Sequence, residues 1–410
     1  MKNLKTKYFK LSKKFLGNIF RQRIGWEKKL MKFFKFLYLL FLFPIEILGD
    51  LFTIKKIFSP AKLPNLNKIL IVKTDQFGDV LFSTFLVPLI KKEHKAVEIH
   101  YLINPKTSVL LEKNPYIDKL YFWKDPFLHF ILGRKEDKKR ESFFKLIKND
   151  YQTMMLLRKE KYDLIINTRA FVPSNNFFLK AMKPKFLIAF DISEQSFLAD
   201  FCAEYDFHEE EWRNFLKLIA PFANIDKASF SPQFYNFDDI GFRKKFIKQT
   251  GKLIIISPVS FDKERLWGIR YWQKLIRYFI ANGYSVVLTG IESQRNYLIK
   301  IADPIDSDRL DIFTNLSIPQ LASLIKFSEI VICIDSFVAH LAIAVNKSLI
   351  CLINPKIYFL KGFSGYKKFI DTKSMIPLIK NVTVLSTIDT NEETVIKHCE
   401  ELIKHTNKIS

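Results

Sequence analysis

The stretch Lys68–Leu89, KILIVKTDQFGDVLFSTFLVPL, decides the fold of this chain. Residues 69–72 form an unbroken apolar run, which is typical of a strand buried on both faces in a parallel sheet. Polar residues follow this run, and a pattern of helical spacing begins after them. The stretch therefore predicts a strand, a loop and a helix that open a βαβ unit.

Two residues of the loop, Gly78 and Asp79, stand beyond the carboxyl end of the predicted strand, where open α/β sheets bind their ligands. Gly78 permits a tight turn or a close backbone approach. Asp79 stands where a carboxylate can accept the first free amides of a helix, so its spacing alone favours an N-cap over a catalytic group. Lys73, at the end of the strand, and Gly78 are expected to support this loop.

The alternation of strands and helices occurs twice along the 410 residues. Further strands are predicted at 97–102, 119–123, 162–167, 186–190, 253–257, 285–289, 330–334 and 349–353. The pattern predicts an α/β fold with two doubly wound, Rossmann-like domains that face each other across a cleft. The expected parts are an extension with linker at 1–66, a first domain at 67–240 and a second domain at 241–410.

The formal net charge is +23, and residues 1–66 hold 15 Lys and Arg against 3 acidic residues. Such a charge suits nucleic acid or an anionic membrane surface. Basic residues at 28–35 run directly into the apolar stretch 36–45, which favours the membrane surface and argues against nucleic acid. The apolar stretch is shorter than the roughly 20 residues of a spanning helix. We expect a basic amphipathic helical extension on the membrane; a helix packed on the protein's own body is the alternative.

The four cysteines are far apart in the sequence and form no CxxC pair. They are Cys202, Cys333, Cys351 and Cys399. This spacing predicts reduced, mostly buried thiols and neither a disulfide framework nor a zinc site.

Polar residues follow three of the predicted strands in the second half of the chain. They are Ser260, Lys263, Arg265, Glu292, Asp335, Ser336 and His340. Because the carboxyl ends of parallel strands share one edge of a sheet, these residues are expected to line one crevice. A helix that opens at or just after Ser336 would aim its amides at an anion, and Glu292 could accept hydrogen bonds from a ribose. The set predicts a nucleoside diphosphate site without a metal.

Five segments, in this order and spacing, resemble glycosyltransferase family 9, whose best known members are the ADP-heptose lipopolysaccharide heptosyltransferases. They are KTDQFGDV, NPYIDKLYF, SPVSFDKERLW, GIES and IDSFVAHLA. The resemblance covers about residues 68–390 and leaves out the basic N-terminal segment. It implies a GT-B fold in which the first domain mainly holds the acceptor and the second holds the nucleotide sugar.

The resemblance also implies roles for single residues. Asp79 matches the general base of the family. Arg265 falls where a lysine usually meets the donor phosphates, and Ser260 lies in the neighbouring phosphate-binding loop. Glu292 matches the acid that binds the ribose.

Asp335, Ser336 and His340 match the Asp-Ser/Thr-Gly-x-x-His element of the family, with one departure. Phe337 replaces the glycine, which normally lets the backbone come close to the phosphates. The replacement implies a rearranged loop, altered donor binding or lost activity. Phe85 also replaces the proline that usually follows the first motif.

The expected function is an inverting, metal-independent transfer of a heptose or similar sugar, without a cofactor. The donor would be a nucleotide diphosphate sugar, most simply one like ADP-heptose, and the acceptor lipopolysaccharide or another lipid-linked cell-surface glycan. The expected place is the cytoplasmic face of a bacterial inner membrane, by peripheral attachment. The alternative is a catalytically silent GT-B relative that binds glycan lipid or a partner transferase at the membrane.

Asp306 and Asp308 form a DxD pair, which binds a metal and a sugar nucleotide in GT-A transferases. Two carboxylates in a polar loop are common, and the double α/β pattern contradicts a GT-A fold. We therefore reject a metal site at this pair.

Overall fold

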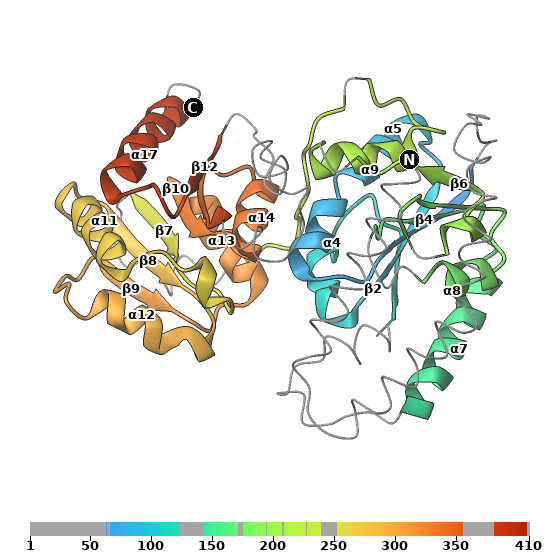
Figure 1. The fold of residues 1–410 in the computed structure, drawn as a ribbon, viewed down its shortest axis with the longest axis horizontal. Coiled ribbons are helices and arrows are strands. Elements are labelled where there is room, and N and C mark those ends of the chain that lie inside the picture. Colours follow the sequence, from blue (N-terminus) through green and yellow to red (C-terminus); the bar gives the residue numbers. More distant parts are fainter. Residues whose placement is uncertain are drawn as a thin grey trace. The chain divides into compact units, whose positions relative to one another are not determined.

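The computed structural model describes residues 63, 66–123, 143–170, 175–193, 195–206, 209–226, 228–238, 252–355 and 381–407. The chain divides into two units (Figure 1). The first unit comprises Met1–Gln76, Leu86–Ser108 and Pro115–Ala228; the second comprises Phe77–Phe85, Val109–Asn114 and Ser229–Ser410. Apart from Leu63 and Leu66, the predicted N-terminal extension lies outside the described residues.

The first unit contains a six-stranded parallel sheet in the order β3-β2-β1-β4-β5-β6. Its strands are β1 (Lys68–Lys73), β2 (Glu98–Ile103), β3 (Lys119–Phe122), β4 (Leu164–Asn167), β5 (Phe186–Phe190) and β6 (Phe201–Ala203). The apolar run at 69–72 forms the buried centre of β1 and so confirms the prediction.

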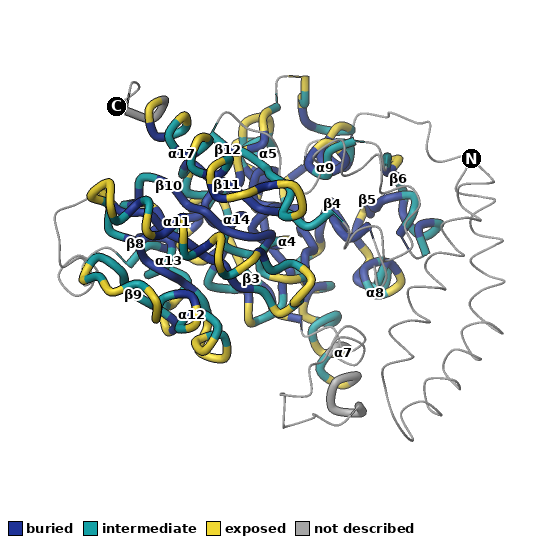
Figure 2. The backbone as a smooth tube through the Cα atoms, turned by 60° about the vertical axis from the view of Figure 1, so that its left-hand side comes forward, coloured by how far each residue is buried: buried dark blue, intermediate teal, exposed yellow. Residues whose placement is uncertain are grey.

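Helices cover both faces of the first sheet because its strands are apolar on both sides. They are α5 (Leu86–Glu93), α7 (Phe143–Lys159), α8 (Asn176–Ala181) and α9 (Glu211–Ile219). Leu70 and Val72 of β1 share one core cluster with Leu157 of α7 and Leu179 of α8. On the other side, α5 packs against α9. Figure 2 shows that the central strands are mostly buried.

The second unit contains another six-stranded parallel sheet, in the order β12-β11-β10-β7-β8-β9. Its strands are β7 (Leu253–Ser257), β8 (Ser285–Thr289), β9 (Leu310–Phe313), β10 (Ile330–Ile334), β11 (Leu349–Ile353) and β12 (Val382–Ser386). Numbered within its own unit, each sheet has the strand order 3-2-1-4-5-6 of Rossmann folds.

In the second sheet the strand order reverses between β7 and β10, and the helices that follow these strands pack on different faces. The helices of this unit are α4 (Phe77–Ser83), α11 (Ile269–Ala281), α12 (Arg295–Ala302), α13 (Ile318–Phe327), α14 (Phe337–Ala344) and α17 (Glu392–Asn407). The core cluster on one face contains residues of α11, α12 and α17. Helix α14 packs against α13 instead. A crevice at the carboxyl ends of β7 and β10 is where such sheets bind ligands.

Three strands, β6, β9 and β12, were absent from the sequence prediction. Each lies at the edge of its sheet, and β9 and β12 are mostly only half-buried, so their apolar patterns are weak. The four cysteines are free and buried, as predicted. Within the described ranges no helix is long and apolar enough to cross a membrane.

Candidate functional site

The centre of the candidate site is an ion pair between the loops that follow β7 and β10. Arg265 Nη1 donates to the carboxylate of Asp335 at 2.8 Å and to its backbone oxygen at 3.0 Å. Asp335 is only 7% exposed, so its charge needs this partner. The structure thus joins two of the predicted site residues at the point where the strand order reverses.

The loop that carries Arg265 is shaped by short-range hydrogen bonds. The backbone N–H of Asp262 donates to Ser260 Oγ at 3.1 Å. Asp262 in turn caps the 3₁₀ turn η4 (Lys263–Arg265) by accepting from the N–H of Glu264 at 3.1 Å. Ser260 therefore holds the loop in shape, and Lys263 begins the turn with an exposed side chain.

Helix α14 begins at Phe337 with Ser336 at the N-cap position, as the sequence predicted. The hydroxyl of Ser336 is buried and has no hydrogen-bond partner among the described residues. The same holds for Nε of Arg265 within this part of the chain. A buried polar atom without a partner costs free energy. These two donors, together with the first amides of α14, are suited to an anion.

Glu292 follows β8, next to β7 in the sheet, and begins the 3₁₀ turn η5 (Glu292–Gln294). Its carboxylate accepts a hydrogen bond from the hydroxyl of Thr314, and Arg295 Nη1 lies 3.9 Å away. The Glu292 side chain is largely exposed, so it can also accept hydrogen bonds from a ligand.

Within the second unit, α4 packs against α14 through Gly78 and His340. A Cβ atom built on Gly78 would lie 2.7 Å from Cδ2 of His340, which is closer than two non-bonded carbon atoms normally approach. Gly78 is therefore required for a close approach and not for a turn. Of the two reasons for a glycine that the sequence offered, the structure selects this one.

Asp79 is the third residue of α4, with an exposed side chain. The expectation that it occupies the N-cap position is wrong, because the helix already begins at Phe77. A carboxylate in the first turn is still favoured by the helix dipole. Burial lowers the pKa of His340 from its ordinary value, and the negative charges of Asp335 and Asp79 oppose this shift. The imidazole of His340 therefore lies close enough to both carboxylates for their charges to act on its pKa.

Phe337, which replaces the motif glycine, is the first residue of α14 and has a helical conformation. A phenylalanine adopts this conformation without strain. Its ring packs against the edge of Phe77, the first residue of α4, with centroids 5.6 Å apart. The side chain of Phe337 therefore has a packing partner in α4.

Lys73 lies in the first unit, at the end of β1. Its Nζ forms an ion pair with Asp75 at 3.1 Å, and Asp75 is also 3.2 Å from Nε of Arg169. Arg169 donates to the hydroxyl of Thr74 at 3.0 Å. The positive charges of Arg169 and Lys73 lower the pKa of Asp75, although burial acts in the opposite direction as the largest single effect. Lys73 therefore contributes to the loop after β1 through Asp75.

Sequence reasoning missed several residues of the second unit's site. Asn354 donates to the backbone oxygen of Glu264 at 2.5 Å, and Trp267 Nε1 donates to the oxygen of Thr390 at 3.1 Å. Phe261 and Ile291, in the loops after β7 and β8, are 60% and 46% exposed. For Phe261 and Ile291 the one signal in the sequence was a large apolar residue within a polar loop, whereas the two hydrogen bonds depend on long-range folding.

The DxD pair lies elsewhere. Asp306 and Asp308 are exposed in the turn that precedes β9, at the amino edge of the second sheet. Arg265 and Asp335 lie at the carboxyl edge. The described ranges contain no group of three or more His, Cys, Asp or Glu side chains that could hold a metal ion.

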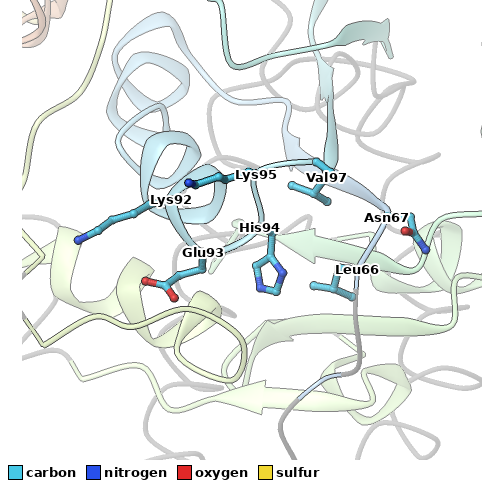
Figure 3. Close-up of a pocket in the computed structure, with 8 residues that line it drawn as sticks. Leu66, Asn67, Lys92, Glu93, His94, Lys95 and Val97 are labelled. Carbon is cyan, nitrogen blue, oxygen red and sulfur yellow. The ribbon is translucent and has the colours of Figure 1, made fainter.

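An open hollow of about 490 Å³ lies in the first unit (Figure 3). It is lined by Leu66, Asn67, Lys92, Glu93, His94, Lys95, Ala96 and Val97. These residues come from the segments before β1 and β2, at the amino edge of the sheet. His94 Nε2 lies 2.8 Å from the backbone oxygen of Phe222. The hollow contains none of the predicted site residues.

Comparison with known proteins points to one family. A family model for glycosyltransferase family 9 (heptosyltransferase) matches residues 152–356. The chain is 24% identical over 357 residues to lipopolysaccharide heptosyltransferase 1 of Campylobacter coli, a match that covers 82% of this chain and 98% of the relative.

Solved structures agree in fold. A glycosyltransferase of family 9 from Veillonella parvula has a TM-score of 0.68 at 17% identity, over 85% of this chain and 100% of that one. An Escherichia coli heptosyltransferase has a TM-score of 0.63 at 13% identity, over 82% and 99%. These similarities confirm the predicted GT-B fold class.

Proposed function

Because this chain belongs to glycosyltransferase family 9, and is therefore a glycosyltransferase, we propose that it moves a heptose or similar sugar from a nucleoside diphosphate donor to lipopolysaccharide or another lipid-linked glycan. The names of the relatives support this choice of substrates. One is a lipopolysaccharide heptosyltransferase, and the Escherichia coli structure was determined with ADP-2-deoxy-2-fluoro heptose. An ADP-heptose-like donor is the simplest choice.

The observation that carries the donor site is the pairing of Arg265 with Asp335 beside the buried hydroxyl of Ser336. Asp335 compensates part of the Arg265 charge and fixes the guanidinium in place. The remaining donors of Arg265, the Ser336 hydroxyl and the first amides of α14 would bind the diphosphate, and exposed Lys263 would add positive charge. Glu292 would accept hydrogen bonds from the ribose.

In the proposed reaction the acceptor hydroxyl attacks the anomeric carbon of the donor sugar in a single displacement. Asp79 accepts the hydroxyl proton, a new C–O bond forms, and the bond to the nucleoside diphosphate breaks. Attack opposite the leaving group inverts the anomeric configuration. An aspartate with an ordinary pKa of about 3.9 is a weak base, so the proton moves late, as the hydroxyl becomes acidic.

Arg265 and Lys263 would stabilise the negative charge that develops on the departing diphosphate. Positively charged side chains can fill the role that a metal ion has in other transferases, so we propose a metal-independent reaction. Transfer that persists in the presence of a strong chelator is the expected result. Activity that disappears with the chelator and returns only with added divalent cation would contradict this part of the proposal.

The proposed location is the cytoplasmic face of the inner membrane, with peripheral attachment through the basic N-terminal segment. The sequence of residues 1–66 is the support, because it combines 15 basic residues with an apolar stretch. Fractionation of cells should place the full chain with membranes, and a chain without residues 1–60 should shift toward the soluble fraction. Equal membrane retention of both chains would argue against this anchor.

A silent GT-B relative is the second candidate, and Phe337 in the place of the motif glycine is the observation that favours it. Calorimetric titration of the full chain with ADP-, UDP- and GDP-sugars separates the two candidates. Tight binding of one nucleotide class, followed by detection of the glycosylated product by mass spectrometry, supports the enzyme. A folded chain that binds none of them supports the silent relative.

A further inference from the structure

Helix α7 of the first unit has one face that belongs to the core. Leu157 is fully buried, and Met154 packs against the same core cluster, together with residues of β1, β3 and β4. Positions 154 and 157 therefore lie on the inward side of the helix. The side chains of α7 that remain exposed need a different explanation.

The exposed side chains of α7 include large apolar residues as well as basic ones. Tyr151 is 59% exposed and Leu156 is 52% exposed. Lys148 and Lys159 are also exposed and, by their spacing of 11 residues, lie on the same side of the helix as each other. The solvent face of a helix in a globular protein is usually polar, so this combination is informative.

The neighbouring helix also exposes a large apolar side chain. Helix α8 packs against α7, and its Phe177 is 70% exposed. Figure 1 shows α7 and α8 side by side in the same unit. We call Lys148, Tyr151, Leu156, Lys159 and Phe177 the α7–α8 surface.

One carboxylate that is close to the α7–α8 surface in the sequence forms its contacts elsewhere. Glu160, which directly follows α7, accepts hydrogen bonds from Lys68 at 2.8 Å and Lys119 at 2.9 Å. It also accepts one from Tyr121. Its negative charge is therefore engaged at the amino edge of the sheet and does not neutralise Lys148 or Lys159.

We propose that the α7–α8 surface docks on an anionic lipid bilayer. Tyr, Leu and Phe side chains enter the boundary between headgroups and acyl chains, while lysines keep their ammonium groups among the phosphates. Charge complementarity with anionic lipid selects this occupant. The inference concerns binding of the first unit to lipid and does not depend on the proposed sugar transfer.

The test compares full-length variants in sedimentation with vesicles. The probes are vesicles of phosphatidylcholine alone and vesicles of equal parts phosphatidylcholine and phosphatidylglycerol. The triple variant Tyr151→Ser, Leu156→Ser, Phe177→Ser and the double variant Lys148→Glu, Lys159→Glu should each bind the anionic vesicles at least roughly tenfold more weakly than wild type. The matched control carries Ile388→Ser, Lys300→Glu and Lys397→Glu, exposed positions of the second unit.

An equal loss in the control variant, or wild-type binding of both α7–α8 variants, would overturn the inference. A second readout does not depend on loss of binding. A polarity-sensitive fluorophore on Tyr151→Cys should shift to the blue with anionic vesicles, whereas the same label on Ile388→Cys should not. The native cysteines are buried, so the introduced thiol is the accessible one. An unchanged emission at position 151 on bound, folded protein would also overturn the inference.

Failure of this inference and failure of the proposed function can be told apart. Vesicle binding is measured without any nucleotide sugar, and donor binding is measured without any lipid. If the chain binds the donor but the label at position 151 does not respond to vesicles, the proposed function stands and the docking surface is wrong. If the label responds to vesicles but no donor binds, the docking surface stands and the proposed transferase is wrong.

Discussion

Arg265 holds Asp335 by two hydrogen bonds from a single nitrogen atom, 2.8 Å to the carboxylate and 3.0 Å to the backbone oxygen, although the residues are 70 positions apart. The contact joins the loop after β7 to the first residue after β10. It fixes a guanidinium at the point where the strand order of the second sheet reverses. This relationship makes the arginine a positioned phosphate ligand instead of a mobile surface charge.

Replacing Arg265 by alanine should weaken nucleoside diphosphate binding by roughly thirtyfold or more, because the ligand loses a hydrogen-bonded positive charge and Asp335 loses its ion pair with Arg265. Arg265→Lys should retain part of the affinity, since lysine keeps the charge but not the planar set of donors. Calorimetric titration with ADP measures both. The control is Arg309→Ala, which removes an arginine that donates to the oxygen of Gly283 at the amino edge. Equal affinities of wild type and Arg265→Ala would contradict the site.

Asp79→Asn should reduce the transfer rate by a factor on the order of 10²–10⁴ because the acceptor hydroxyl loses its proton acceptor. Donor affinity should stay within about threefold of wild type, since the diphosphate ligands are unchanged. Rates come from product formation and affinities from calorimetry. Asp303→Asn, at an exposed carboxylate of the same unit, is the control. Wild-type turnover of the Asp79 variant would remove this residue from the reaction.

Gly78→Ala should destabilise the chain by about 1–3 kcal/mol, because the new methyl group would meet the ring of His340 at 2.7 Å. Adding His340→Ala should recover most of this loss, since it makes room for the methyl group. Denaturant unfolding of the four chains in a double-mutant cycle measures the interaction. Additive effects of the two substitutions would show that the ring and the glycine do not pack together.

Phe337→Gly tests whether the departure from the family motif affects the donor site. The variant should lose about 1–2 kcal/mol of stability, because the ring contact with Phe77 disappears and glycine disfavours the helix. ADP affinity should stay within about threefold of wild type. A large gain of affinity in the variant would mean that Phe337 blocks the site, which favours the silent relative.

Glu160 should make the stability of the chain sensitive to acid. Hydrogen bonds from Lys68 and Tyr121, and then from Lys119, lower the pKa of Glu160 to about 2, against an ordinary value of 4.5. A carboxyl whose pKa is lowered by folding contributes stability above the unfolded pKa and loses it as pH falls toward the folded pKa. The contribution should therefore be complete above about pH 4.5 and disappear toward pH 2.

Glu160→Gln should lower the free energy of unfolding at pH 7 by no more than about 2 kcal/mol, since water still reaches this cluster. Its stability should also change less between pH 4.5 and 2 than that of wild type. Urea unfolding across this range provides the comparison, and Glu393→Gln, at an exposed carboxyl near the start of α17, is the control. Parallel pH profiles for wild type and Glu160→Gln would contradict the assignment.

Much of the fold could be predicted from the sequence because strands buried on both faces need continuous apolar runs. The predicted bounds of β5, β7, β8, β10 and β11 agree with the structure residue for residue. The strand expected at 162–167 is shorter, since β4 begins at Leu164. Local sequence patterns fix element types well and element ends poorly, because the ends depend on neighbouring residues.

The candidate site was predictable as a set of residues and not as a set of contacts. The sequence by itself determined that polar residues follow the strands of a parallel sheet, because chain direction brings all carboxyl ends to one edge. Only the tertiary structure decided that Arg265 pairs with Asp335, that His340 requires a glycine at position 78, and that Asp79 lies in the first turn of α4. The first two facts depend on side chains that meet across long sequence separations, which no local pattern records. The third depends on where a helix begins, which local patterns place poorly.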